Sequence, residues 1–153
     1  MAKPRKISDL SSEDAAYIAG IIDGEGTVTL VRKNKKENRR LAVTISNTEF
    51  DMLNWIKKKV NAGVIVNKHS TNGKWAEAFT YQVYNRQAYD LLSKTYTYMR
   101  SHKRKRAELA LREYLKVTPR NGKYTPELLV KRNKFIEDFF KIRCSLKIGP
   151  VLN

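Results

Sequence analysis

Apolar residues follow two different periods along the chain, and the alternation between these periods predicts the order of its elements. In residues 11–23, apolar and small side chains recur every three or four positions, which is typical of a helix packed on a core. Residues 27–33 and 40–47 are rich in β-branched side chains and indicate two strands, joined by the polar turn 34–38. Residues 48–60 then return to the helical period.

The second half of the chain repeats this order and then adds helices. It predicts two more strands followed by three helices, at residues 64–69, 76–84, 85–98, 101–116 and 125–141. Short polar side chains stand at the expected helix starts and would cap them, namely Ser11, Thr48, Asn85 and Thr125. The order α-ββ-α-ββ-α-α-α predicts an α+β fold, with one four-stranded antiparallel sheet, helices packed on one face and the other face free.

The chain is strongly basic, and this narrows the class of its partner. Its 153 residues suit one compact domain, which we expect at residues 11–153 after a basic arm at residues 1–10. Lysine and arginine number 31 against 15 acidic residues, and the net charge of +16 favours nucleic acid as the partner. We expect an intracellular, soluble protein without a membrane partner, because no apolar run has membrane-spanning length and no signal peptide is visible.

Few residues are suited to other kinds of chemistry. Cys144 is the single cysteine, and His69 and His102 are the only histidines, so we expect neither a disulfide framework nor a zinc site. The sequence contains no Walker loop, no GxGxxG and no Ser/His/Asp arrangement. We therefore expect no small-molecule substrate.

The free face of the predicted sheet is the candidate nucleic-acid surface. Strand alternation puts polar, basic and β-branched side chains on this face, namely Thr29, Val31, Lys33, Arg40, Thr44, Lys68, Ser70, Thr80 and Gln82. Such side chains suit a β-ribbon in the DNA major groove, where base edges offer donors and acceptors. The basic run 100–106 adds Lys105 as a candidate for phosphate contact. An ordinary solvated sheet face uses the same residue types, and the sequence leaves the strand register open.

The segment that ends the first helix carries the most distinctive pattern. Ala16, Gly20 and Gly24 recur every four residues on one side of a helix, where a second backbone could approach closely. Asp23 and Glu25 lie at the C-terminal end of this helix, where we expect a glycine-rich turn. A carboxylate there would meet its counterpart from a partner helix. Two such acids need a cation between them, as in metal-dependent phosphoryl chemistry.

Residues 18–26 (IAGIIDGEG) closely resemble the nine-residue signature of the LAGLIDADG homing endonucleases. The order of elements is also similar to the α-β-β-α-β-β-α core of that family, and the resemblance covers residues 11 to about 140. It implies sequence-specific cleavage of double-stranded DNA, with Mg²⁺ or Mn²⁺, at a long pseudo-palindromic site. Because the chain carries one copy of the signature, the resemblance also implies a homodimer that pairs the motif helices through Ala16, Gly20 and Asp23.

The resemblance assigns roles to particular positions. Glu25, the last acid of the signature, corresponds to the metal ligand of the family, and the carbonyl of Gly24 corresponds to one that faces the metal. Asn47 ends the second predicted strand, where relatives hold a polar group that organises the catalytic water. Lys103 stands where single-motif relatives place a lysine of the catalytic pocket. Asp23 corresponds to a helix-end and interface residue.

Two alternative functions remain compatible with the sequence. Some relatives act as intron RNA maturases or DNA-binding regulators, so a non-cleaving nucleic-acid-binding protein on the same fold is one alternative. A small basic ribosomal-type protein is the other. It would explain the charge but not a glycine-flanked carboxylate at the end of a helix with a small-residue face.

Overall fold

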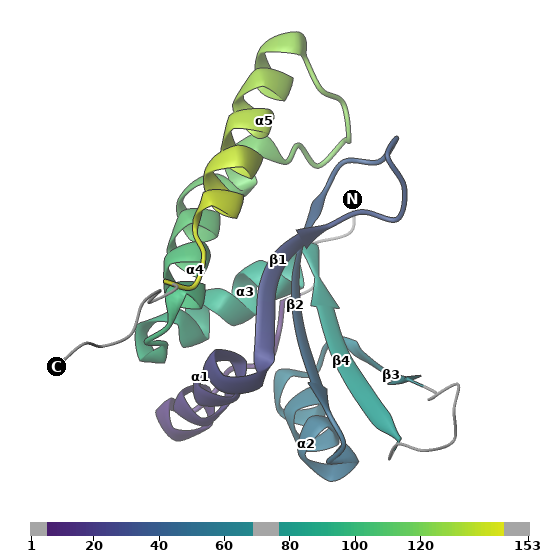
Figure 1. The fold of residues 1–153 in the computed structure, drawn as a ribbon, viewed down its shortest axis with the longest axis vertical. Coiled ribbons are helices and arrows are strands. Elements are labelled where there is room, and N and C mark those ends of the chain that lie inside the picture. Colours follow the sequence, from purple (N-terminus) through teal and green to yellow (C-terminus); the bar gives the residue numbers. More distant parts are fainter. Residues whose placement is uncertain (1–5, 69–76, 146–153) are drawn as a thin grey trace, which may run out of the picture.

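The structure is a computed structural model, and it describes residues 6–68 and 77–145. Its elements follow the order α-ββ-α-ββ-α-α-α (Figure 1). The strands are β1 (Gly26–Val31), β2 (Arg40–Asn47), β3 (Val64–Lys68) and β4 (Ala78–Tyr84). The helices are α1 (Ser12–Glu25), α2 (Phe50–Val60), α3 (Asn85–Thr95), α4 (His102–Glu113) and α5 (Pro126–Lys141), with short 3₁₀ turns at Tyr96–Tyr98 and Leu115–Val117.

The strands form one four-stranded antiparallel sheet in the order β1-β2-β4-β3, which confirms the predicted α+β fold. β2 lies between β1 and β4, and its bounds agree with the prediction. Thr44 of β2 is level with Thr27 of β1 on one side and with Gln82 of β4 on the other. This register determines which side chains share a face.

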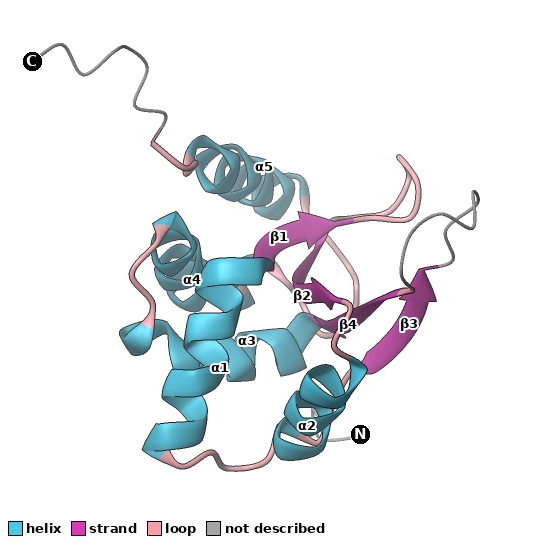
Figure 2. Ribbon diagram, turned by 60° about the horizontal axis from the view of Figure 1, so that its bottom comes forward, coloured by secondary structure: helices cyan, strands magenta, loops and turns pink. Residues whose placement is uncertain are grey.

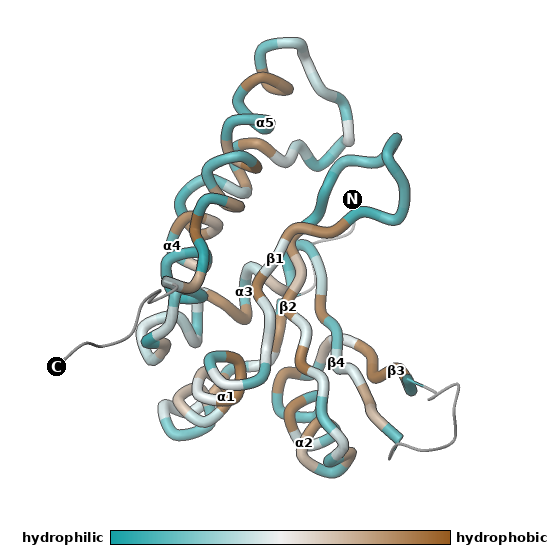
Figure 3. The backbone as a smooth tube through the Cα atoms, in the orientation of Figure 1, coloured by the Kyte–Doolittle hydropathy of each residue, from teal (hydrophilic) through white to brown (hydrophobic). Residues whose placement is uncertain are grey.

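One face of the sheet carries the hydrophobic core. Its inward side chains include Leu41, Val43 and Ile45 on β2 and Tyr81 and Val83 on β4, all of them buried. The helices α1, α2 and α3 pack on this face, and in the described part of the chain no helix covers the opposite face (Figure 1 and Figure 2). The loop between β1 and β2 reaches past the core and is hydrophilic throughout (Figure 3).

The helices α4 and α5 extend the molecule beyond the β1 edge of the sheet (Figure 1). One arginine from each helix connects it to the sheet or to the segments beside the sheet. Arg106 of α4 donates to the Val28 carbonyl of β1 at 2.9 Å, which occupies an acceptor of this edge strand. Arg132 of α5 is buried and donates to the carbonyls of Val117 and of Arg39, the residue before β2. These bonds fix α5 relative to the base of the β1–β2 loop.

The end of the first helix differs from its prediction. α1 does not stop in a glycine-rich turn but runs to Glu25, and Gly26 opens β1 in an extended conformation. Glycine is required here for space, because a Cβ at this position would lie 2.8 Å from the Ile22 Cα and 3.2 Å from the Thr44 carbonyl oxygen. The helix therefore passes into the sheet without a connecting loop.

Two of the four predicted helix caps are wrong. Ser11 and Thr125 accept hydrogen bonds from the first turns of α1 and α5, as predicted. Thr48 does not cap α2, which begins two residues later. Asn85 is instead the first residue of α3, with a φ of 56°, and its side-chain oxygen accepts from the Tyr114 hydroxyl.

The predicted basic arm includes residues that pack on the core. Ile7 is buried, and its N–H donates to the Asp90 carboxylate of α3 at 3.0 Å. The Ser8 N–H donates to the Val60 carbonyl at the end of α2. Residues 7 and 8 of this segment are therefore held between α2 and α3.

Other boundaries move by a few residues and leave the topology unchanged. β1 ends at Val31, two residues earlier than predicted, and β4 begins at Ala78, two residues later. The third and fourth helices end at Thr95 and Glu113, and a 3₁₀ turn follows each of them. Among the described residues, none of the helices combines the length and the apolar composition that crossing a membrane requires.

Candidate functional site

The junction between α1 and β1 brings two of the predicted site residues into contact. Glu25 ends α1, Asn47 ends β2, and the Asn47 amide donates a hydrogen bond to the Glu25 carboxylate. The side-chain oxygen of Asn47 accepts from the Glu49 N–H at 2.8 Å, which fixes the orientation of the amide. Glu25 is exposed, so its carboxylate is within reach of a ligand from outside the chain.

Lys103 lies against the same helix end. Its Nζ donates to the carbonyl oxygen of Ile22 at 3.0 Å and to that of Asp23 at 2.8 Å, in the last turn of α1. A cation at this position interacts favourably with the negative end of the helix dipole. Partial burial lowers the pKa of Lys103, although the charge of Asp23 opposes this shift. The structure therefore brings Lys103 to the turn that carries Glu25.

Asp23 is engaged within the chain. Its carboxylate accepts from the Ser101 hydroxyl at 2.6 Å, from the Arg100 N–H at 2.6 Å and from the Ser101 N–H at 3.2 Å. Burial alone raises the pKa of Asp23, but these hydrogen bonds and the nearby charge of Lys103 outweigh it, so the pKa is lowered. The carboxylate thus joins the end of α1 to the start of α4. The expected part of Asp23 in a dimer interface stays a prediction.

The outward side of α1 carries small residues at three positions, one turn apart. Ala16, Gly20 and Gly24 are all exposed. A Cβ at Gly20 or Gly24 would meet no atom within 4 Å, so the packing of this chain does not require glycine at either position. A surface of this kind lets a second helix approach closely. Contact with a partner chain and the metal-facing role of the Gly24 carbonyl stay predictions.

The open face is the side of the sheet opposite the core. The register arranges its side chains in rows across the strands, which are Val31 and Arg40; Thr29, Ala42 and Tyr84; Thr27, Thr44, Gln82 and Val64; Ser46, Thr80 and Val66; and Lys68 and Ala78. Seven of the predicted DNA-contact residues lie in these rows, namely Thr29, Val31, Arg40, Thr44, Lys68, Thr80 and Gln82. The rows combine hydroxyl, amide, cationic and aliphatic groups and contain no acidic side chain.

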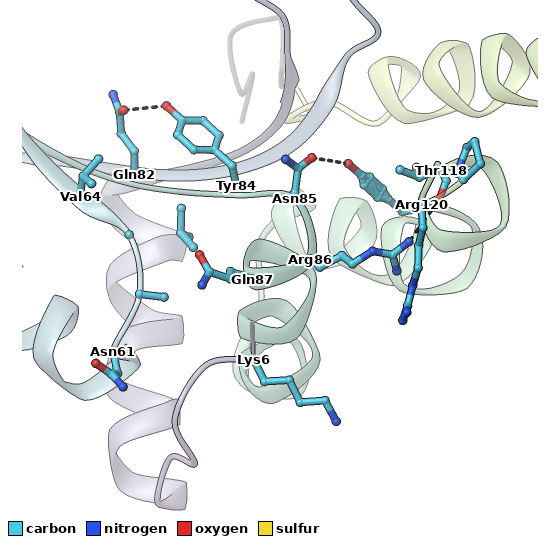
Figure 4. Close-up of a pocket in the computed structure, with 15 residues that line it drawn as sticks. Lys6, Asn61, Val64, Gln82, Tyr84, Asn85, Arg86, Gln87, Thr118 and Arg120 are labelled. Atoms are coloured by element: carbon cyan, nitrogen blue, oxygen red, sulfur yellow. Dashed lines mark hydrogen bonds between the residues drawn. The ribbon is translucent and has the colours of Figure 1, made fainter. Parts of the chain in front are cut away.

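Tyr84 organises two of these side chains. The Arg40 guanidinium lies over the Tyr84 ring, 4.2 Å from its centroid, and the Tyr84 hydroxyl donates to Gln82 Oε1 at 2.6 Å. Gln82 and Tyr84 point to the same side of β4 (Figure 4). Thr27 was not among the predicted contacts, although the alternation that selected Thr29 also selects it.

Three predicted contact residues lie outside these rows or outside the described residues, and a fourth, Thr80, lies in a row but is buried. Thr80 is 4% exposed and its hydroxyl is paired with that of Ser46 at 2.8 Å, so it supports the open face from within. Lys33 lies beyond the end of β1, exposed in the loop. Lys105 is exposed on α4, which packs beside α3 and the β1 edge. Ser70 lies outside the described residues.

The metal-ligating capacity of one chain is small. The described residues contain no group of three or more His, Cys, Asp or Glu side chains that could hold a metal ion. The exposed carboxylate of Glu25 is nevertheless an oxygen donor of the kind that Mg²⁺ prefers, and this ion commonly takes one or two carboxylates and keeps several waters. The donors of one chain therefore fit part of such a site.

Comparison with known proteins finds solved structures with a similar fold. No family model matches the sequence, and no curated protein matches it. The homing endonuclease I-CvuI, in complex with its target, matches with a TM-score of 0.69 and 18% identity over 91% of this chain and 87% of that chain. The archaeal intron-encoded homing endonuclease I-Vdi141I, complexed with DNA, matches with a TM-score of 0.61 and 19% identity over 91% and 88%.

A third match differs in its coverage. The LAGLIDADG meganuclease I-CpaMI, bound to uncleaved DNA, matches with a TM-score of 0.59 and 11% identity over 89% of this chain but only 52% of that chain. The predicted resemblance is confirmed at the level of the fold, which is that of the LAGLIDADG homing endonucleases.

Proposed function

We propose that this protein is a site-specific homing endonuclease that cuts both strands of a long DNA target with the help of divalent metal ions. The contact between Glu25 and Asn47 carries the proposal, because it sets an exposed carboxylate at the end of a strand of the open face. The net charge of +16 favours DNA as the partner. The similar structures of I-CvuI and I-Vdi141I are complexes with DNA, which supports the same partner here.

The proposed active form is a homodimer. Glu25 supplies one carboxylate per chain. The small residues on the outward side of α1 suit close approach by a second copy of the same helix. The match to about half of I-CpaMI supports this, since a chain of that length has room for two such units. Pairing α1 with its copy would bring two Glu25 carboxylates together and align two open faces. The target would then be pseudo-palindromic, like the dimer.

The site residues would divide the work of phosphodiester hydrolysis. A bound Mg²⁺ or Mn²⁺ would lower the pKa of a water and stabilise charge on the leaving 3′ oxygen. Glu25 from each chain would hold the ion. Asn47 would orient both the Glu25 carboxylate, which its amide already contacts, and the attacking water. Lys103 would offset negative charge on the phosphate, since its ammonium group lies at the helix turn that carries Glu25.

The open face would recognise the sequence in the major groove. Arg40 is held over Tyr84 and could offer two parallel donors to a guanine edge. The Gln82 amide and the Thr44 hydroxyl could pair with other base edges. Val31 and Val64 could contact thymine methyl groups.

The test is cleavage of a plasmid library with random inserts, in Mg²⁺ and separately in Mn²⁺. The wild-type protein should nick or linearise a subset of the plasmids, and chelation of the metal should stop the reaction. Glu25→Gln should lower the cleavage rate by roughly 100-fold or more, because the ion loses a charged ligand. Glu13→Gln is the matched control: it removes the same charge from the other end of α1 and should cut like the wild type.

Cleavage by Glu25→Gln at the wild-type rate would refute the assignment of this carboxylate. Binding of duplex DNA without cleavage in either metal would instead support the alternative of a non-cleaving nucleic-acid-binding protein.

A further inference from the structure

A large open cavity lies at the end of β4 (Figure 4). It has a volume of about 1060 Å³ and is bounded by the turn at residues 61–63, the start of α3 and the loop that begins at Thr118. Its wall includes Val64, Gln82 and Tyr84, which also belong to the open face. The cavity is therefore continuous with the surface proposed to bind DNA.

The lining of this cavity is cationic. Lys6, Arg86 and Arg120 line it, and none of its lining residues is an aspartate or a glutamate. Arg86 donates from one guanidinium nitrogen to the Thr118 carbonyl at 3.2 Å, which holds it in the wall while other N–H donors remain. In the described part of the chain, no salt bridge involves any of these three cations.

The cleft between α4 and α5 shows that a basic composition alone does not explain a cavity lining without acidic side chains. That cleft also contains cations, but its lining includes Glu113 and Asp138. Lys116 pairs with Glu113 at 3.8 Å, and Lys134 pairs with Asp138 at 3.4 Å. Two acids therefore offset part of the charge of the four cations that line this cleft. The cavity at the end of β4 has no such internal balance and suits an anionic ligand.

We propose that this cavity binds backbone phosphates of the DNA duplex where the duplex leaves the open face. The inference rests on the proposed function for the position of the DNA. The planar guanidinium groups of Arg86 and Arg120 match the oxygens of a phosphate, and Lys6 adds a point charge. Such contacts strengthen binding to any sequence and position the duplex, while the open face selects the bases.

The experiment compares two double variants that remove the same charge. Lys6→Gln with Arg120→Gln changes the cavity but none of the residues proposed to act in cleavage. Lys58→Gln with Lys131→Gln changes exposed positions on α2 and α5 that do not line the cavity. Binding to a random-sequence DNA duplex is measured by fluorescence anisotropy over a series of salt concentrations, without divalent ions so that no strand is cut.

The cavity variant should lower the slope of log Kd against log salt concentration by about 1.8, which corresponds to two lost phosphate contacts. The control variant should keep the wild-type slope. A variant with Lys6→Gln and Arg120→Lys keeps one of the two charges, so it should show about half of this decrease in slope. Arg86 is left in place, because its bond to Thr118 holds the loop.

Equal slopes for the two double variants would overturn the inference. If the slopes were equal but Arg40→Gln on the open face weakened duplex binding, the proposed function would stand and only the inference about the cavity would fail. A cavity variant that lost binding only to a single-stranded probe would also overturn the inference, because the cavity would then belong to unpaired nucleic acid. A wild-type protein that bound no duplex DNA would refute the proposed function itself.

Discussion

The two sides of α1 carry similar small residues in opposite surroundings. On the inward side Ala15 and Ala19 are buried, and Gly26 just after the helix has no room for a Cβ. On the outward side Gly20 and Gly24 face open space. The inward residues are small because this chain packs tightly around them. Packing within one chain does not explain why the outward residues are small. The comparison therefore separates what the fold requires from what the proposed dimer requires.

The two carboxylates at the end of α1 show the same contrast. Asp23 accepts three hydrogen bonds from the residues that start α4, so its charge is used to join two helices. Glu25, two residues later, is exposed and contacts only the Asn47 side chain among its described hydrogen-bond partners. One acid is structural and the other is available to a ligand.

The largest expected change in the free energy of unfolding concerns the closely packed inward side of α1 and the glycine that follows it. Gly26→Val should lower the free energy of unfolding by roughly 3 kcal/mol, because its side chain would collide with the Ile22 backbone and the Thr44 carbonyl. Gly24→Ala, on the open side, should change it by less than about 1 kcal/mol. Urea denaturation measures both. Similar stabilities for the two variants would mean that the inward side is not as tightly packed as described.

The next effect distinguishes the two acids. Asp23→Asn should lower the free energy of unfolding by about 2 kcal/mol, because the amide loses charge-assisted hydrogen bonds from Ser101 and Arg100. Glu25→Gln should change it by no more than about 0.5 kcal/mol, as for an exposed side chain. The same denaturation series tests both variants, and the opposite order would exchange the roles of the two acids.

A smaller effect follows from the pKa of Asp23, which is lowered in the folded protein. Its contribution to stability is therefore fully present above the unfolded pKa of about 3.9 and is lost as the pH falls through the lower folded value. The wild type should lose more stability than Asp23→Asn between about pH 5 and about pH 3. Parallel losses, measured by urea denaturation at both pH values, would argue against this linkage.

The smallest effect is on the outward side. Gly20→Ala should raise the stability of the single chain by about 0.5–1 kcal/mol, because alanine favours a helix and its Cβ meets nothing. The same change should weaken self-association, which analytical ultracentrifugation measures. Unchanged association would place the proposed dimer contact elsewhere on the molecule.

Local patterns predicted the order of elements, because this order depends on short-range periodicity. The resemblance to the LAGLIDADG family, and not the local pattern, assigned Glu25 and Asn47 to the same site. Local patterns could not predict contacts made by distant residues. Asn85 was expected to cap a helix, but its side chain binds the Tyr114 hydroxyl, 29 positions away. Gly26 was expected in a turn, but a close backbone approach determines its role.

The open face shows the same division between local and distant information. Alternation selected most of its side chains, whereas the register was needed to show that Thr80 is buried beneath the surface and paired with Ser46. The cationic cavity was not predicted, because Lys6, Arg86 and Arg120 come to line the same cavity only after the chain has folded.

The direct passage from α1 into β1 has a consequence for how this protein could change its target. With no loop after Glu25, the distance from this carboxylate to Thr27 and Thr29 is set by the geometry of one helix end and one strand. A residue inserted there would turn these threonines toward the core and Val28 toward solvent. If the protein cuts DNA as proposed, the side chains that recognise bases could be exchanged during evolution. The cutting position, in contrast, could not shift along the DNA relative to the recognised bases.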